Sequence, residues 1–229
     1  MTPQPSIIES LKEAEQIALQ LFQTIQQKNL IKAGKSENQL NEEIFDIATQ
    51  EFGIKKYWHK RIVRAGKNTL RPYNENPENL IIASDDIVFF DFGPIIEQWE
   101  ADLGRTYVLG NNLNKLKLAK DVELLWQQCR YWYFNNLGTT GAEFFDYIVA
   151  QAKEMGWTFG GEIAGHLVGQ FPHEKLGDGI KDHYVHPKNF KPMNTPGSNG
   201  QPRNWILEIH LVDKENEIGG FFEQLLIQE

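Results

Sequence analysis

Two pairs of acidic residues, each set in a predicted β-hairpin, constrain the fold of this chain more than any other feature. In the C-terminal pair, two apolar segments flank a turn at residues 214–217. Antiparallel partners keep a constant sum of residue numbers, so pairing Asp213 with Ile218 places Glu208 directly opposite Glu223. The strands are otherwise apolar enough to be buried. The hairpin therefore brings two carboxylates together inside the fold.

The N-terminal pair follows the same rule. A turn near Ile96 and Glu97 sets Asp91 opposite Asp102. Directly opposed side chains have Cβ atoms about 4.5–5.5 Å apart, and like charges at that separation destabilise a sheet. Two such clashes in one chain predict that cations complete the site. Together with His166, the four carboxylates form the ligand set of a hydrolytic centre that binds two metal ions.

The composition argues against several classes of protein. The formal net charge of −8 disfavours a nucleic-acid partner, which would favour a basic face. No apolar run reaches the roughly 18 residues of a membrane span, and the N-terminus has no signal-peptide pattern. Cys129 is alone, so no disulfide forms within the chain, which suits the reducing cytoplasm. With 41% hydrophobic residues, we expect a single domain over residues 1–229.

The predicted elements occur in a repeated order. A capping box pairs an N-cap hydroxyl with an acidic or amide side chain three residues later. Three predicted helices open with one: Ser6 with Glu9, Ser36 with Gln39, and Thr140 with Glu143. A fourth helix, rich in large residues, is expected over 116–136. The order is helix, helix, acidic hairpin, and then the same again, which predicts an α+β fold of two similar halves with the acids between them.

These ordered residues resemble the pita-bread metallopeptidases, which include methionine aminopeptidase, aminopeptidase P, prolidase and creatinase. The resemblance extends from about Ile8 onward. Its motifs are Asp91-Phe-Gly, Asp102-Leu-Gly-Arg-Thr after ten intervening residues, Gly165-His166 with His173 seven residues on, and then the two C-terminal glutamates. The chain has the length of the catalytic domain alone, as in methionine aminopeptidase. We therefore expect the pita-bread fold, with two pseudo-symmetric helix-helix-sheet halves around a dinuclear metal site.

The resemblance also implies a role for each residue. Glu208 would shuttle the proton of a nucleophilic water that lies between two metal ions. His173 would hydrogen-bond the substrate carbonyl and stabilise its developing charge. The ions, Mn, Co, Fe or Zn, would be held by five ligands: Asp91 on one ion, Asp102 and Glu223 between both, and His166 and Glu208 on the other.

The part of the chain that would hold the substrate departs from the family pattern. Aminopeptidase P and prolidase carry a His-Tyr pair where this chain has Pro72 and Tyr73. His59, nearby in sequence, is a candidate to bind substrate instead. Residues 175–204 form a long predicted loop with basic residues that include Lys191 and Arg203. We expect this loop either to close over the ions and bind a substrate carboxylate, or to pack against a neighbouring subunit.

The resemblance implies a hydrolase similar to the Xaa-Pro aminopeptidases and dipeptidases that act on short peptides. Two alternatives stay open. One is hydrolysis of a non-peptide amide or guanidino compound, as in creatinase, and the other is a non-catalytic binding protein of the same fold. The expected partners are a short peptide or small amide and, in a homodimer, a second copy of the chain, with no nucleic acid and no membrane.

Overall fold

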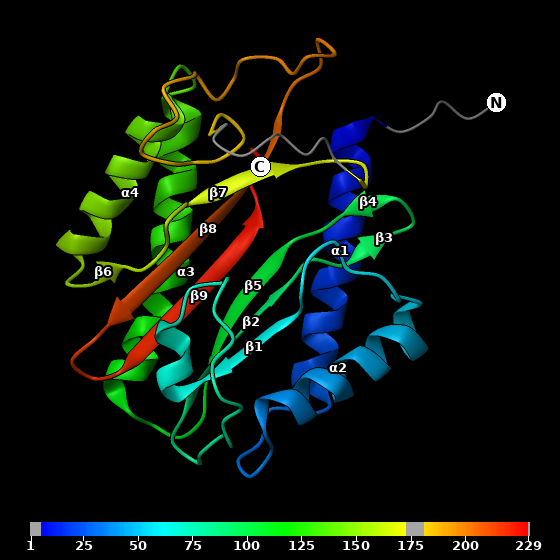
Figure 1. Cartoon of the computed structure of the whole chain (residues 1–229), viewed down its shortest axis with the longest axis vertical. Helices are drawn as coiled ribbons and strands as arrows, with labels where there is room; N and C mark the ends of the chain where they lie inside the picture. The colour runs from blue at the N-terminus through cyan, green and yellow to red at the C-terminus, as the bar shows by residue number, and fades with distance from the viewer. Residues whose placement is uncertain (1–5, 173–180, 229) are drawn as a thin grey trace.

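The computed structural model describes residues 6–172 and 181–228. Two helices precede the main strands of each half, and the strands of both halves join in one sheet (Figure 1). The helices are α1 (Ile7–Gln27), α2 (Glu37–Phe52), the 3-10 helix η1 (Gly66–Leu70), α3 (Leu113–Asn135) and α4 (Gly141–Glu154). Among the described helices, none is long and apolar enough to cross a membrane.

The described strands fall into one large sheet and one small one. The large sheet has the order β1-β2-β5-β9-β8-β6, with β7 paired to β8, and the small sheet pairs β3 with β4. The strands are β1 (Ile62–Ala65), β2 (Ile87–Phe92), β3 (Ile95–Ile96), β4 (Trp99–Glu100), β5 (Leu103–Val108), β6 (Thr158–Phe159), β7 (Gly165–Val168), β8 (Asn204–Asp213) and β9 (Ile218–Leu225).

The predicted starts of three helices are confirmed. Ser6, Ser36 and Thr140 are N-caps, and each forms a complete capping box with the residue three positions later. α2 ends at Gly53, whose left-handed backbone (φ 68°) is a conformation that glycine adopts without strain. The side chain of Asn112 accepts hydrogen bonds from first-turn N–H groups of α3. Local capping residues therefore set these helix ends.

The two acidic hairpins adjoin at the centre of the large sheet. The β8–β9 hairpin has the predicted register, in which Asp213 pairs with Ile218 and Glu208 lies opposite Glu223. β5 meets β9 where Gly104 pairs with Glu223. The arrangement confirms the expected α+β fold of two helix-helix-sheet halves.

The register predicted for the first hairpin is wrong by two residues, because Asp91 pairs with Gly104 and not with Asp102. The turn lies at Glu97 and Gln98 within the small β3–β4 hairpin, where Glu97 adopts a left-handed backbone (φ 57°). Side chains alternate along a strand with a period of two. A shift of two residues therefore leaves Asp91 and Asp102 on the same face, where they still meet.

Side chains of β2 point alternately to the two faces of the sheet, with the phenylalanines on the face covered by helices and Asp91 on the other. In β2, Phe90 and Phe92 are fully buried and pack against Phe22 of α1, with ring centroids 6.1 and 5.6 Å apart. Each fully buried large apolar side chain contributes roughly 1.5–3 kcal/mol. Asp91 lies between the two phenylalanines in sequence, so its side chain points to the opposite face of the sheet. That opposite face is where the acidic residues gather.

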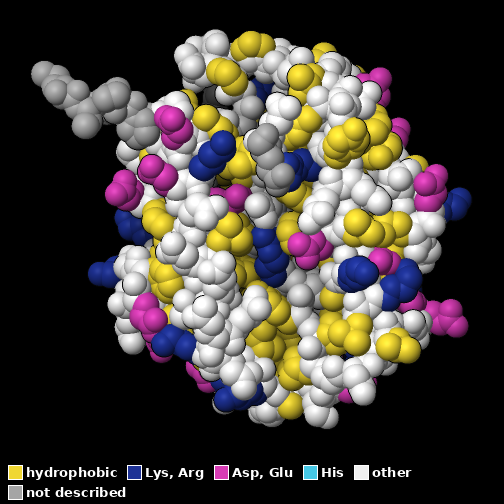
Figure 2. All heavy atoms as spheres, turned by 180° about the vertical axis from the view of Figure 1, so that it is seen from behind, with side chains coloured by type: hydrophobic (Ala, Val, Ile, Leu, Met, Phe, Trp, Pro, Cys, Tyr) yellow, Lys and Arg dark blue, Asp and Glu magenta, His cyan; other side chains and the backbone are white. Residues whose placement is uncertain are grey.

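Seen from behind, the surface shows hydrophobic, basic and acidic side chains side by side (Figure 2). α3 carries several exposed large hydrophobic residues: Leu113, Leu116, Leu124 and Tyr131. Single exposed apolar side chains are normal on protein surfaces. The exposed residues of α3 therefore do not identify a partner, and the homodimer stays a prediction.

Candidate metal centre

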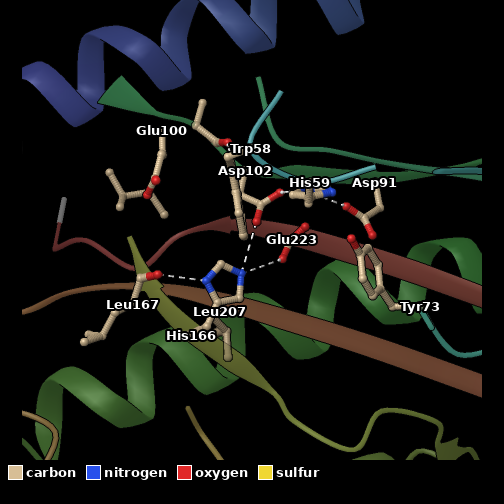
Figure 3. A network of polar contacts seen from close by, with 12 residues as sticks. Trp58, His59, Tyr73, Asp91, Glu100, Asp102, His166, Leu167, Leu207 and Glu223 are labelled. Carbon is tan, nitrogen blue, oxygen red and sulfur yellow. Dashed lines mark hydrogen bonds and ion pairs between the residues drawn. The ribbon is translucent and has the colours of Figure 1, made fainter. Parts of the chain in front are cut away.

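Four of the five predicted ligands lie close together, beside His59 (Figure 3). Asp91 lies in β2, Asp102 directly before β5, His166 in β7 and Glu223 in β9. With His59 they form two groups, in each of which the ligand atoms lie within 4.8 Å of one another: His59, Asp91 and Asp102, and then Asp102, His166 and Glu223. Asp102 belongs to both groups, so the two adjoin.

His166 contacts its group through Nε2. This atom lies 3.1 Å from Oδ2 of Asp102 and 3.6 Å from Oε1 of Glu223. The other ring nitrogen, Nδ1, lies 2.9 Å from the carbonyl oxygen of Leu167. Since a carbonyl oxygen only accepts, Nδ1 is the donor and Nε2 is offered to the acids. Metal-binding histidines are typically oriented by such a hydrogen bond.

His59 comes from the segment before β1 and lies in the other group. Its Nε2 is 3.1 Å from Oδ1 of Asp102 and 3.5 Å from Oδ1 of Asp91. Its Nδ1 donates to the carbonyl oxygen of Lys60 at 2.7 Å. The structure thus places this residue, which was predicted to bind substrate, directly against the carboxylates.

Glu208 and His173 are the two predicted catalytic residues. Glu208 lies on β8 directly opposite Glu223. It therefore adjoins the group of His166. His173 lies outside the described residues, so its role stays a prediction.

The described site holds more acidic groups than its two histidines can neutralise. Asp102 and Glu223 are each only 2% exposed, and Oε2 of Glu223 has no hydrogen-bond partner. Burial raises the pKa of Glu223 well above its usual value, and the neighbouring Asp102 charge adds to this effect. Burial acts on the pKa of Asp102 in the same direction, but His59 and His166 outweigh it and lower that pKa. A buried, uncompensated carboxylate is costly, so these residues fit a divalent cation.

The sequence of the chain matches a known protein family. The profile described as metallopeptidase family M24 matches residues 9–197. The chain belongs to metallopeptidase family M24. This membership confirms the resemblance carried by the ordered motifs. No curated protein matches the chain.

Three solved structures that share the fold of this M24 chain are named as peptidases. A prolidase from Thermococcus sibiricus has a TM-score of 0.72 and 21% identity, over 97% of this chain and 59% of that one. An X-Pro aminopeptidase from Thermotoga maritima has a TM-score of 0.72 and 20% identity, over 100% and 63%. A methionine aminopeptidase from Rickettsia prowazekii has a TM-score of 0.69 and 13% identity, over 98% and 95%. This chain thus spans about three-fifths of the first two proteins. The likenesses confirm the pita-bread fold.

Trp58 and Gly93 shape the M24 centre around its histidines. The Trp58 ring packs against the rings of His59 and His166, with centroids 4.4 and 5.2 Å away. A Cβ atom at Gly93 would lie 2.2 Å from Cδ2 of His59, so this glycine leaves room for the imidazole. The ordered motifs do not include Trp58. Its position directly before a histidine is the signal that the sequence offers.

Arg105 and Thr106 join the two halves of the M24 fold beside the ligands. Nη1 of Arg105 donates to the carbonyl oxygen of Glu223 at 2.8 Å. The Thr106 hydroxyl accepts from the N–H of Phe221 at 2.7 Å and donates to its carbonyl oxygen at 2.9 Å. These side chains connect β5 to β9, two strands whose backbone pairing is the single pair Gly104 and Glu223. They therefore hold Glu223 in place relative to the N-terminal ligands.

In the described part of the long loop, two basic residues are already paired. Nζ of Lys191 lies 2.9 Å from Oδ2 of Asp182, and Nη2 of Arg203 lies 3.3 Å from the same oxygen. Arg203 also donates to the carbonyl oxygen of Asp182 at 2.9 Å. Both cations stabilise the loop itself. This pairing disfavours the expectation that either one binds a substrate carboxylate.

Proposed function

We propose that this chain is a metal-dependent peptidase that holds two divalent ions and removes an N-terminal residue from short peptides. The observation that carries the proposal is the position of Asp102, whose two carboxylate oxygens each face a different histidine. Asp102 and Glu223 would lie between the two ions. Asp91 would bind one ion, and His166 and Glu208 would bind the other.

The metal ions and the side chains would divide the chemistry between them. When bound, divalent ions lower the pKa of water and polarise a carbonyl oxygen. Glu208 would take the proton of the attacking water and pass it to the leaving amine, because this partly buried residue lies directly opposite Glu223 among the ligands. Trp58 would limit the entry of further water, because its ring covers both histidines.

Short peptides with proline in the second position are the proposed substrates. The shared fold with a prolidase and an X-Pro aminopeptidase supports this choice. Pro72 stands where the family pattern has a histidine. The contacts that bind the peptide are therefore proposed to differ from those of prolidase and aminopeptidase P. The complete set of acids and histidines disfavours a non-catalytic binding protein.

Metal analysis combined with a peptide panel tests this function. The chain would be purified without oxygen, loaded with Mn, Co, Fe or Zn, and analysed for bound ions. Xaa-Pro dipeptides, Xaa-Pro tripeptides and peptides that begin with Met-Ala would then be compared as substrates. We expect two ions per chain and preferred cleavage of the Xaa-Pro peptides. A metal-loaded chain that cleaves none of them would contradict the peptidase proposal.

A Glu208→Gln variant tests the proposed proton transfer. The substitution keeps a ligand oxygen and the side-chain shape but removes the base, so turnover should fall by on the order of a hundredfold or more while metal binding persists. Glu215→Gln, at an exposed position in the β8–β9 turn, is the matched control and should keep its activity. Equal turnover in both variants would show that Glu208 is not the base.

The remaining expectations stay predictions. They are the catalytic role of His173, manganese as the metal, a homodimer, a location in the cytoplasm and a single domain over residues 1–229. The buried free thiol of Cys129 is compatible with a reducing compartment.

A further inference from the structure

We infer that His59 is itself a metal ligand, so that each of the two ion positions contains one imidazole and both share Asp102. The inference rests on the proposed metal-dependent function and adds a sixth ligand to the five that the ordered motifs supply. One ion would lie among His59, Asp91 and Asp102. The other would lie among Asp102, His166 and Glu223.

The two histidines are placed alike around Asp102. Nε2 of His59 lies 3.1 Å from Oδ1, and Nε2 of His166 lies 3.1 Å from Oδ2. The next carboxylate oxygen is 3.5 Å away for His59, from Asp91, and 3.6 Å away for His166, from Glu223. Two atoms that bind one ion at about 2.1 Å with an angle of about 90–110° lie about 3.0–3.4 Å apart. Both groups therefore have nearly the spacing of ligands that converge on a cation.

Both imidazoles are also held in the same orientation. Nδ1 of each ring lies near the carbonyl oxygen of the residue that follows, at 2.7 Å for Lys60 and 2.9 Å for Leu167. Each Nδ1 is therefore a donor, and each Nε2 faces a carboxylate oxygen. In a neutral imidazole the Nε2 lone pair and that oxygen repel each other unless a cation or proton lies between them. An ion at this point would satisfy both atoms.

The surroundings of His59 suit a fixed ligand. Its side chain is only 8% exposed. The rings of Trp58 and Tyr73 pack against it, with centroids 4.4 and 5.7 Å away. On another side Gly93 leaves space that a larger residue would fill. Packing of this kind restricts rotation of the ring, so Nε2 stays directed at Asp91 and Asp102.

A second imidazole changes which metals the centre favours. Carboxylate-only sites suit Mn, whereas imidazole also suits Zn and Fe. With one nitrogen at each ion position, the chain should discriminate more strongly in favour of Zn over Mn than a centre with one histidine for two ions. The preference is a property of binding, and it is measurable without turnover.

X-ray absorption spectroscopy on the zinc-loaded full chain tests the ligand directly. If His59 binds, the spectrum should contain on average about one imidazole per zinc ion, and if only His166 binds it should contain about half an imidazole per ion. Two bound ions with about half an imidazole each would overturn the inference while leaving the proposed function intact. A chain that binds no divalent metal under any condition would instead contradict the proposed function.

Calorimetric zinc titration of variants gives an independent measurement. His59→Phe keeps a ring against Trp58 but lacks the nitrogen, so the affinity of one site should fall by more than about 100-fold. Residues that only orient ligands typically change affinity by about 10–100-fold. His186→Phe removes a histidine outside both groups and is the matched control. Two zinc sites of unchanged affinity in His59→Phe would refute the assignment.

Discussion

Glu15 gives the chain a pH-dependent stability that one substitution should remove. Its side chain lies on α1, is 4% exposed, and accepts hydrogen bonds from the N–H of Leu225 at 2.7 Å and Nε2 of Gln224 at 3.2 Å. Burial raises its pKa from 4.5 to about 7 and outweighs the opposite effect of these hydrogen bonds. Between these two values the folded chain keeps a proton that the unfolded chain has released.

The direction of the effect follows from this difference in bound protons. Because the folded-state pKa is raised, the contribution to stability is present below about pH 4.5 and is lost as the pH rises to about 7. The loss is on the order of 3 kcal/mol. Glu15→Gln cannot ionise, but its amide N–H group faces Gln224, which costs about 1 kcal/mol. We therefore expect the variant to be about as stable as the natural chain near pH 5 and more stable by about 2 kcal/mol near pH 8.

Urea denaturation across this pH range measures the effect as a difference in the free energy of unfolding. The metal-centre acids titrate in both proteins and cancel in that difference. Glu13→Gln, at an exposed position of the same helix, is the matched control and should give a difference that is independent of pH. If the difference between Glu15→Gln and the natural chain is equal near pH 5 and pH 8, the reasoning about burial is refuted.

Three further predictions concern the metal centre and the core. A chelator should lower the melting temperature, and added Mn or Zn should restore it, because the buried acids repel each other without a cation; an unchanged calorimetric transition would count against a buried site. Gly104→Ala should destabilise the fold by roughly 1–3 kcal/mol and weaken metal binding, because the new Cβ would lie 2.4 Å from the Phe221 ring and 2.9 Å from Cβ of Glu223. Gly138→Ala, with nothing within 4 Å, is its control in the same denaturation and titration assays. Phe90→Ala should cost about 3–5 kcal/mol of unfolding free energy in urea, and a cost below about 1 kcal/mol would contradict its place in the core.

Features that depend on a few neighbouring residues were predictable from the sequence. The capping boxes at Ser36 and Thr140 need only side chains three residues apart. The pairing of Glu208 with Glu223 follows from one short turn. In the hairpin that contains Asp91 and Asp102, the sequence around residues 96–98 does not distinguish between two neighbouring positions of the turn. The observed one places Gly104 against the Phe221 ring, where no side chain fits, and this distant contact is not visible in the hairpin sequence.

β1 and the position of His59 depend on contacts that the sequence pattern does not reveal. β1 contains Arg64, which is 3% exposed and so is unusual for a core strand. Carbonyl oxygens of the following loop accept its hydrogen bonds at 2.8, 3.0 and 2.9 Å: those of Arg71, Pro72 and Glu75. His59 similarly reaches the acids only because Gly93, far along the chain, leaves space for its ring. Long-range packing therefore decides both features.

The two ligand groups differ in which half of the fold supplies their residues. His59, Asp91 and Asp102 all belong to the N-terminal half, so their ion position exists once that half is in place. The other position also needs His166 and Glu223, and it forms only after β5 and β9 have met. An ion in the first position would therefore bind residues of the N-terminal half alone. An ion in the second position would bind residues of both halves and so resist their separation.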